Sequence, residues 1–117
     1  MKIKEIVKLL DAEVFAGGDK LDMDVCSACG SDMMSDVLAF VKEQAVLLTG
    51  LVNSQVIRTC QMMDMHCIVL VRGKFPTKEM VNLAEECGIV ILSTKSRMYC
   101  ACGKLYSHGL QGGDAYE

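Results

Sequence analysis

The stretch CSACGSDMMSD, residues 26–36, contains two kinds of side chain that could carry chemistry. Cys26 and Cys29 form a CxxC pair, a spacing found in metal sites and in thiol–disulfide motifs. Asp32 and Asp36 are four residues apart, which places both carboxylates on one face of a helix. There they could bind Mg²⁺ or a ribose hydroxyl, or they could lie in solvent and interact favourably with the helix dipole. The solvated interpretation is favoured for Asp36, and both stay open for Asp32.

The chain contains seven cysteines, and Cys100 and Cys102 form a second close pair. In a strand, Cys26 and Cys29 would face opposite sides, and in a helix Cys100 and Cys102 would point about 200° apart. Neither pair then converges on one metal ion, so buried structural cysteines are favoured. The alternative is a metal or redox site that uses these four thiols, with residues 26–29 in a turn. Cys29 also keeps the alternative of a reactive or ligand-contacting thiol.

The elements that must position these residues are predicted by hydrophobic periodicity. Residues 45–49, 67–71 and 89–93 are continuous apolar runs, which is typical of strands covered on both faces. Each run is followed by a stretch with helical periodicity. Residues 45–108 therefore alternate strand and helix three times, a pattern that predicts parallel strands joined by right-handed helical crossovers.

Capping residues predict where the helices begin and end. The predicted N-caps are Ser31 for the second helix, Asn53 or Ser54 for the third, Thr77 after Pro76 for the fourth, and Thr94 or Ser96 for the fifth. Gly88 is predicted as the glycine that ends the fourth helix.

The first third of the chain is expected to complete the sheet. Ile3, Ile6 and Leu10 predict an amphipathic helix. The runs at 13–17 and 23–30 are separated by a polar turn and are predicted to be neighbouring strands. We therefore expect an α/β fold: a single layered domain over residues 1–109, with a mostly parallel sheet of about five strands and covering helices. Residues 110–117 are expected to be a disordered tail.

Composition excludes several classes of protein. Twelve basic and fifteen acidic residues give a net charge of −3 with no basic face, so nucleic acid is not an expected partner. No apolar run approaches the roughly 20 residues of a membrane span, and the start does not resemble a signal peptide. We expect a cytoplasmic location with reduced thiols. Nine methionines suggest apolar surface that remains for a partner, and a homodimer is the expected form.

Ligands of open α/β sheets bind at the carboxyl ends of the strands. Hydroxyls, glycines and basic side chains follow each predicted strand and could hold a phosphate or a nucleotide, although turns and caps use the same residue types. The candidate ligand-binding residues are Ser31, Asp32, Thr49, Gly50, Ser93, Thr94 and Lys95. The turn Arg72-Gly73-Lys74 lies at the same edge.

No catalytic set is evident in the sequence. His66 and His108 are far apart and have no evident nucleophile partner, and no GxSxG, GxGxxG or GxxxxGK[ST] motif is present. We therefore expect no enzyme activity, no cofactor and no metal.

The segments EVFAGGDKLDMDV, ACGSDMMSDVLAFVKE, AVLLTG and LAEECGIVILSTKS resemble, in this order, the DRTGG domain family over roughly residues 1–109. The chain is also similar to the N-terminal domains of the HPr kinase/phosphorylase. The resemblance implies an α/β accessory or regulatory domain that often self-associates and has no established catalytic activity. Such modules accompany phosphotransacetylases and CBS-containing pyrophosphatases, and stand-alone members are encoded beside iron hydrogenases. The chain departs from the family after Asp22, where Met23 and Ser27-Ala28 replace the expected arginine and glycine pair.

The sequence thus predicts a non-catalytic regulatory or ligand-sensing accessory domain that self-associates and binds an adenine-type nucleotide. Two alternatives stay open. One is the metal or redox protein that uses Cys26, Cys29, Cys100 and Cys102. The other is an interaction module that docks on a larger enzyme, such as an iron hydrogenase.

Overall fold

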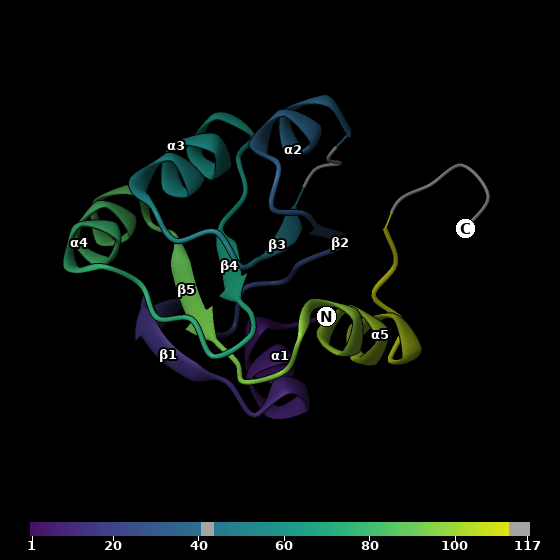
Figure 1. Cartoon of the computed structure of the whole chain (residues 1–117). Coiled ribbons are helices and arrows are strands. Elements are labelled where there is room, and N and C mark those ends of the chain that lie inside the picture. Colours follow the sequence, from purple (N-terminus) through teal and green to yellow (C-terminus); the bar gives the residue numbers. More distant parts are fainter. Residues whose placement is uncertain (41–43, 113–117) are drawn as a thin grey trace.

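A computed structural model describes residues 1–40 and 44–112 of the chain. Within these residues the chain forms one five-stranded sheet and five α-helices (Figure 1). The strands are β1 (Glu13–Ala16), β2 (Ser27–Gly30), β3 (Ala45–Thr49), β4 (Cys67–Leu70) and β5 (Val90–Ser93). The helices are α1 (Ile3–Leu10), α2 (Met34–Phe40), α3 (Ser54–Met62), α4 (Lys78–Cys87) and α5 (Met98–Ser107), with a 3₁₀ turn, η1, at Gly18–Lys20.

The sheet has the order β1-β5-β4-β3-β2. β2, β3, β4 and β5 are parallel, and β1 pairs with β5 in the antiparallel sense. Every residue of β3, β4 and β5 is buried, which explains why these strands appear in the sequence as continuous apolar runs. The predicted fold class, an α/β domain with a mostly parallel sheet of about five strands, is confirmed.

The helices form two layers because the crossovers share one hand. The chain steps from β2 to β5 in one direction across the sheet, so right-handed connections place α2, α3 and α4 on the same face. α1 and α5 cover the opposite face (Figure 1). Side chains of β3 alternate between the layers: Leu47 packs toward α2–α4, and Val46 and Leu48 pack toward α1 and α5.

The prediction that the runs at 13–17 and 23–30 are neighbouring strands is wrong. β1 and β2 lie at opposite edges of the sheet. The chain between them passes along the first turn of α1, where Lys4 N–H donates to the carbonyl of Leu21 and Ile3 N–H donates to that of Met23. The polar turn is therefore the start of a connection that crosses the sheet to the opposite edge, and not the turn of a hairpin. β1 forms its hydrogen bonds with β5 instead.

The predicted helix boundaries are correct where a side chain makes the cap. Asn53 accepts hydrogen bonds from the backbone of Gln55 and Val56, Thr77 accepts one from Met80, and Gly88 ends α4 in the left-handed conformation. Two N-caps are wrong, and both mark helices that begin later than expected. These are Ser31, since α2 begins at Met34, and Thr94 or Ser96, since α5 begins at Met98 after Arg97, which makes no side-chain cap.

The wrongly predicted caps have other partners. The Ser31 hydroxyl accepts a hydrogen bond from Met33 N–H in a local turn. The Thr94 hydroxyl accepts one from Ser96 N–H and donates to the carbonyl of Leu10, which closes the end of α1. Ser31 thus satisfies loop backbone, and Thr94 satisfies loop backbone and the last carbonyl of α1, rather than the N-terminus of the helix that follows.

The predicted tail falls partly outside the described residues, at 113–117. Within the described part, Leu110 is buried, and Gln111 accepts a hydrogen bond from Ala28 of β2. The domain bounds and the disorder of the tail stay predictions. No helix in the described residues is long and apolar enough to cross a bilayer.

We expect Thr94→Val to lower the free energy of unfolding by about 1–3 kcal/mol, since it leaves the buried Leu10 carbonyl without its donor and the Ser96 N–H without its acceptor. Valine keeps the volume, so the loss reports the hydroxyl alone. Ser107→Ala, which removes an exposed hydroxyl bonded to Gly103, is the control and should change stability by less than about 0.5 kcal/mol. Chemical denaturation measures both variants, and equal values for the two would contradict the role of Thr94.

Candidate functional site

The carboxyl ends of β2, β3, β4 and β5 lie along one edge of the sheet because these strands are parallel. The connections after β2, β3 and β4 turn toward the layer of α2–α4. The connection after β5 turns to the other layer and enters α5. Neighbouring strands whose connections leave in opposite directions open a crevice in doubly wound sheets. In this chain that place is the end of β4 and β5.

The first polar group at this edge is built around Asp32, which follows β2. One carboxylate oxygen of Asp32 accepts hydrogen bonds from the Thr49 hydroxyl at 3.0 Å and from Gly50 N–H at 2.6 Å. Its other oxygen lies 3.8 Å from the Arg72 guanidinium. Asp32 and Arg72 side chains are both about half exposed, at 50% and 48%. One carboxylate oxygen of Asp32 thus binds the end of β3, and the other oxygen faces solvent and Arg72.

Arg72 is a residue that sequence reasoning placed at the edge but did not include among the candidates. Its φ is +61°, and its N–H donates to the carbonyl of Ser96, while Gly73 N–H donates to that of Thr94. The guanidinium lies over Gly50, where a Cβ would collide with it. The turn after β4 therefore holds a cation at the centre of the edge. The available signal was a basic residue directly after a buried strand.

The second polar group surrounds a hollow of about 350 Å³ at the end of β5. It is lined by Asp11, Glu13, Gly73, Phe75, Ser93, Thr94 and Lys95. Phe75 is 61% exposed and meets Phe15 edge to face, with ring centroids 5.6 Å apart. Asp11 and Glu13 reach the hollow because β1 is antiparallel, so its beginning lies beside the end of β5.

The seven predicted site residues thus fall into two groups rather than one. Ser31 belongs to the turn before α2, next to Asp32, and Asp32 contacts Thr49 and Gly50. The other three candidates, Ser93, Thr94 and Lys95, line the β5 hollow. Of the other four residues of that hollow, Gly73 was placed at this edge but was not a candidate, and Asp11, Glu13 and Phe75 were not predicted. Asp11 and Glu13 enter only through the placement of β1.

Much of the polar chemistry at this edge already serves the fold. The Ser93 hydroxyl donates to the carbonyl of Lys74, and the Thr94 hydroxyl donates to that of Leu10. Lys95 makes no ion pair with any residue in the described ranges. The groups left to meet a ligand are therefore Lys95, Arg72, the outer oxygen of Asp32, the two carboxylates of the hollow and the ring of Phe75.

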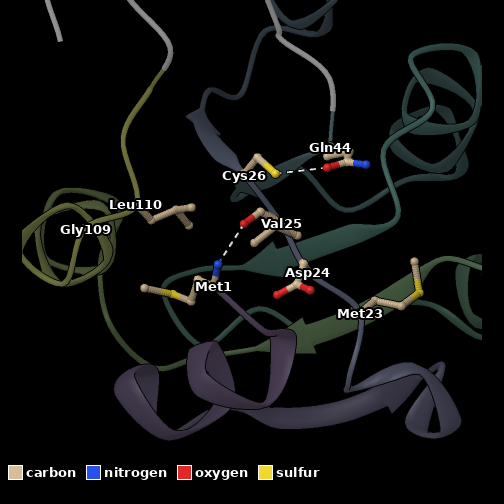
Figure 2. A pocket seen from close by; sticks show the side chains of 8 residues that line it. All are labelled: Met1, Met23, Asp24, Val25, Cys26, Gln44, Gly109 and Leu110. Atoms are coloured by element: carbon tan, nitrogen blue, oxygen red, sulfur yellow. Dashed lines mark hydrogen bonds between the residues drawn. The ribbon is translucent and has the colours of Figure 1, made fainter.

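A larger hollow of about 730 Å³ lies at the opposite edge, where the parallel strands begin (Figure 2). Several of its polar groups already have partners: the amino group of Met1 donates to the Val25 carbonyl, and Cys26 Sγ donates to Gln44 at 2.9 Å. Asp24 lies 3.8 Å from Lys2. It is broad and open to solvent, and Gln44 directly follows residues outside the described part. We therefore favour the smaller hollow at the carboxyl edge as the ligand site.

The four thiols of the CxxC and CxC pairs do not converge. Cys26 and Cys100 are exposed, and Cys29 and Cys102 are half-buried and pack in different layers. No group of three or more His, Cys, Asp or Glu that could hold a metal occurs in residues 1–40 and 44–112.

Burial determines how readily the inner thiols ionise. Burial raises the pKa of Cys29, with smaller contributions from Cys102 and Asp36, and burial also raises the pKa of Cys102. Burial raises the pKa of Cys60 to about 12 and raises that of Cys67 still further. A raised pKa means a protonated, unreactive thiol at neutral pH. These four cysteines are therefore apolar packing groups under ordinary conditions.

Comparisons with known proteins agree with this architecture. The model of the DRTGG domain family matches residues 5–106. Among solved structures, the chain is similar to the CBS and DRTGG domains of the regulatory region of Clostridium perfringens pyrophosphatase, complexed with the activator diadenosine tetraphosphate. The TM-score is 0.73 at 16% identity, over 89% of this chain and 45% of that one. The chain thus spans less than half of that regulatory region, and the likeness shows the fold. The search of curated proteins found no match.

We expect Cys26 and Cys100 to react rapidly with Ellman's reagent at pH 8, whereas Cys60 and Cys67 react only as the protein unfolds. Mass spectrometry of the labelled protein identifies which thiols are modified in each phase. The double variant Cys26→Ser/Cys100→Ser is the control and should lose the fast phase. Rapid labelling of Cys67 in the folded wild-type protein would contradict the buried position of β4.

The raised thiol pKa values also predict how stability depends on pH. A thiol that ionises near its ordinary value of 9.0 when unfolded, and only at about 12 when folded, stabilises the fold fully below pH 9. As pH rises from 9 toward 12, the free energy of unfolding should fall by about 1.4 kcal/mol per pH unit for each such thiol. Denaturant titrations at several pH values test this. Cys60→Ala should fall less steeply than wild type, and identical slopes would refute the assignment.

Proposed function

Because the chain belongs to the DRTGG domain family, we propose that it is a non-catalytic regulatory domain that senses an adenine-type nucleotide at the β5 hollow. The observation that carries this proposal is the exposed Phe75 ring beside carboxylates and a lysine in one hollow at the carboxyl edge. A volume of about 350 Å³ falls within the usual range of small-molecule sites, about 300–1,000 Å³.

The ring of Phe75 supports stacking of a nucleobase. An aromatic side chain that is 61% exposed, and packs edge to face with Phe15, offers an apolar surface to a ligand. Stacking of a base on an aromatic ring contributes about 1–3 kcal/mol.

The charges favour different positions for the nucleoside and the phosphate of the ligand. Asp11 and Glu13 would repel a phosphate inside the hollow, and their oxygens instead suit ribose hydroxyls or an exocyclic amine. Lys95 lines the hollow, and Arg72 directly precedes Gly73 in its wall, so a phosphate is accommodated outside, along the edge toward Arg72. In this arrangement Arg72 exchanges its 3.8 Å contact with Asp32 for a stronger contact with the phosphate.

The comparison with the pyrophosphatase region is consistent with this choice of ligand. That region binds diadenosine tetraphosphate as an activator, and it contains both CBS and DRTGG domains. A regulatory role and an adenine nucleotide are therefore reasonable for a chain with the same fold. The metal or redox alternative is not proposed, since the four thiols point to different places.

Self-association and docking on a larger enzyme complete the proposal, as expected of a small accessory domain. A homodimer is the form to test first, by light scattering of the purified chain over a hundredfold range of concentration. A constant mass of 12.8 kDa across that range would exclude the homodimer and leave the nucleotide site unaffected.

We expect AMP and ATP to bind with measurable heat in calorimetry, and Phe75→Ala to weaken both by about tenfold, because the stacking surface is lost. Lys95→Ala should weaken ATP more than AMP, since ATP carries the greater phosphate charge. Tyr99→Ala, which removes a still more exposed ring on α5, is the control and should leave affinity unchanged. Absence of binding to wild type, or equal loss in the control, would refute the site.

A further inference from the structure

The outer face of α5 consists of Tyr99, Cys100, Gly103, Tyr106 and Ser107, and it has no partner in the described part of the chain. Tyr99 is 89% exposed and Tyr106 is 53% exposed. Between the two rings nothing lies within 4 Å of the position a Cβ would take at Gly103. Together with Cys102, these residues line a groove of about 430 Å³ on the helix.

The composition of this face is unusual for a helix that contacts only water. α5 buries Ala101 and Leu105 against the sheet, so the other side should carry charged residues. Lys104 is the one charged residue in the helix sequence MYCACGKLYS. Two tyrosines spaced by seven residues, with a glycine between them, instead form an aromatic groove in which another backbone can approach closely.

The segment that contains α5 has charges of a single sign. Residues 95–112 contain Lys95, Arg97 and Lys104 and no Asp or Glu, so this segment has a charge of +3. The rest of the chain has a charge of −6, and the two together give the net charge of −3. None of these three cations forms an ion pair with any residue that the structure describes. Arg97 directly precedes α5, and Lys104 lies seven positions further along, so the backbones of the two cations are about 10 Å apart along the helix axis.

We propose that the outer face of α5 docks an acidic amphipathic helix of a partner protein. A leucine or methionine of that helix enters the groove over Gly103 between the two tyrosine rings. Acidic residues two turns apart on the partner reach Arg97 and Lys104. Tyrosine and arginine are the side chains that most often dominate binding at protein interfaces, and the unpaired cations supply the electrostatic complementarity.

The same charges argue against other occupants. In a symmetric pair of copies centred on Gly103, each Lys104 approaches the other copy's groove, so like charges meet. Anionic membrane surfaces typically bind clusters of four to eight basic residues, more than the three present here. The partner is therefore a protein helix with negative charge.

The test uses a synthetic fluorescein-labelled helical peptide with leucines at i, i+4 and i+7 and glutamates beside them. Fluorescence anisotropy should show saturable binding to the wild-type chain that weakens as salt is raised. The same peptide with every glutamate replaced by lysine should bind at least tenfold more weakly. Lys104→Glu should lose at least tenfold in affinity for the glutamate peptide. Arg58→Glu, an exposed residue of α3 in the other layer, should not.

Gly103→Ala separates docking from folding. Alanine in a helix interior is more favourable than glycine, and the open space at Gly103 accepts a methyl group, so Tm should rise. The same methyl group occupies the point of closest approach in the groove, so peptide affinity should fall at least fivefold. A lower affinity in a more stable protein cannot be attributed to misfolding.

Three results would overturn the proposal. The first is equal affinity for the glutamate and lysine peptides. The second is a dimer in light scattering that Lys104→Glu or Gly103→Ala dissociates, which would assign the face to a second copy. The third is sedimentation of wild type, but not of Lys104→Glu, with phosphatidylserine vesicles, which would assign it to a lipid surface. None of the three substitutions, Lys104→Glu, Gly103→Ala and Arg58→Glu, lies in the β5 hollow. The affinity for ATP should therefore be the same in every variant.

Discussion

Three neighbouring strands, β3, β4 and β5, have every residue buried, and both faces of the sheet must therefore be covered by helices. This requirement determines most of the architecture. Parallel strands need crossovers, the crossovers share one hand, and a sheet that grows in one direction places α2, α3 and α4 in a single layer. The other face is left for α1 and α5. The change of layer after β5 then creates the diverging connections at which the β5 hollow lies.

The buried centre of the fold is predictable because its signals are local. Apolar runs specify β3, β4 and β5, and side-chain caps such as Asn53 and Thr77 specify where helices begin. The edges of the sheet are not predictable in this way. β1 has hydrophobic partners on β5, about 80 residues away, and nothing in its own sequence distinguishes that pairing from a hairpin with residues 23–30.

The same distinction applies to the candidate site. The carboxyl edge follows from strand direction, so Thr49, Gly50 and the residues after β5 could be identified from the sequence. Arg72 and Phe75 acquire their positions from a turn with a positive φ and from a ring contact with Phe15. Hydroxyls that suggested ligand binding, above all that of Thr94, are bonded to backbone carbonyls instead. A residue type suitable for a ligand is equally suitable for a loop, and only tertiary contacts separate the two roles.

One contact at the far side of the sheet bears on how the molecule behaves in a crowded solution. β2 is an edge strand, and the segment after α5 lies along it, where Gln111 accepts a hydrogen bond from Ala28. An uncovered strand edge is a template on which another chain can add a strand and begin open-ended aggregation. The residues after α5 therefore cover part of this edge, and a truncation that removed them would expose backbone groups of β2 to pairing with another chain.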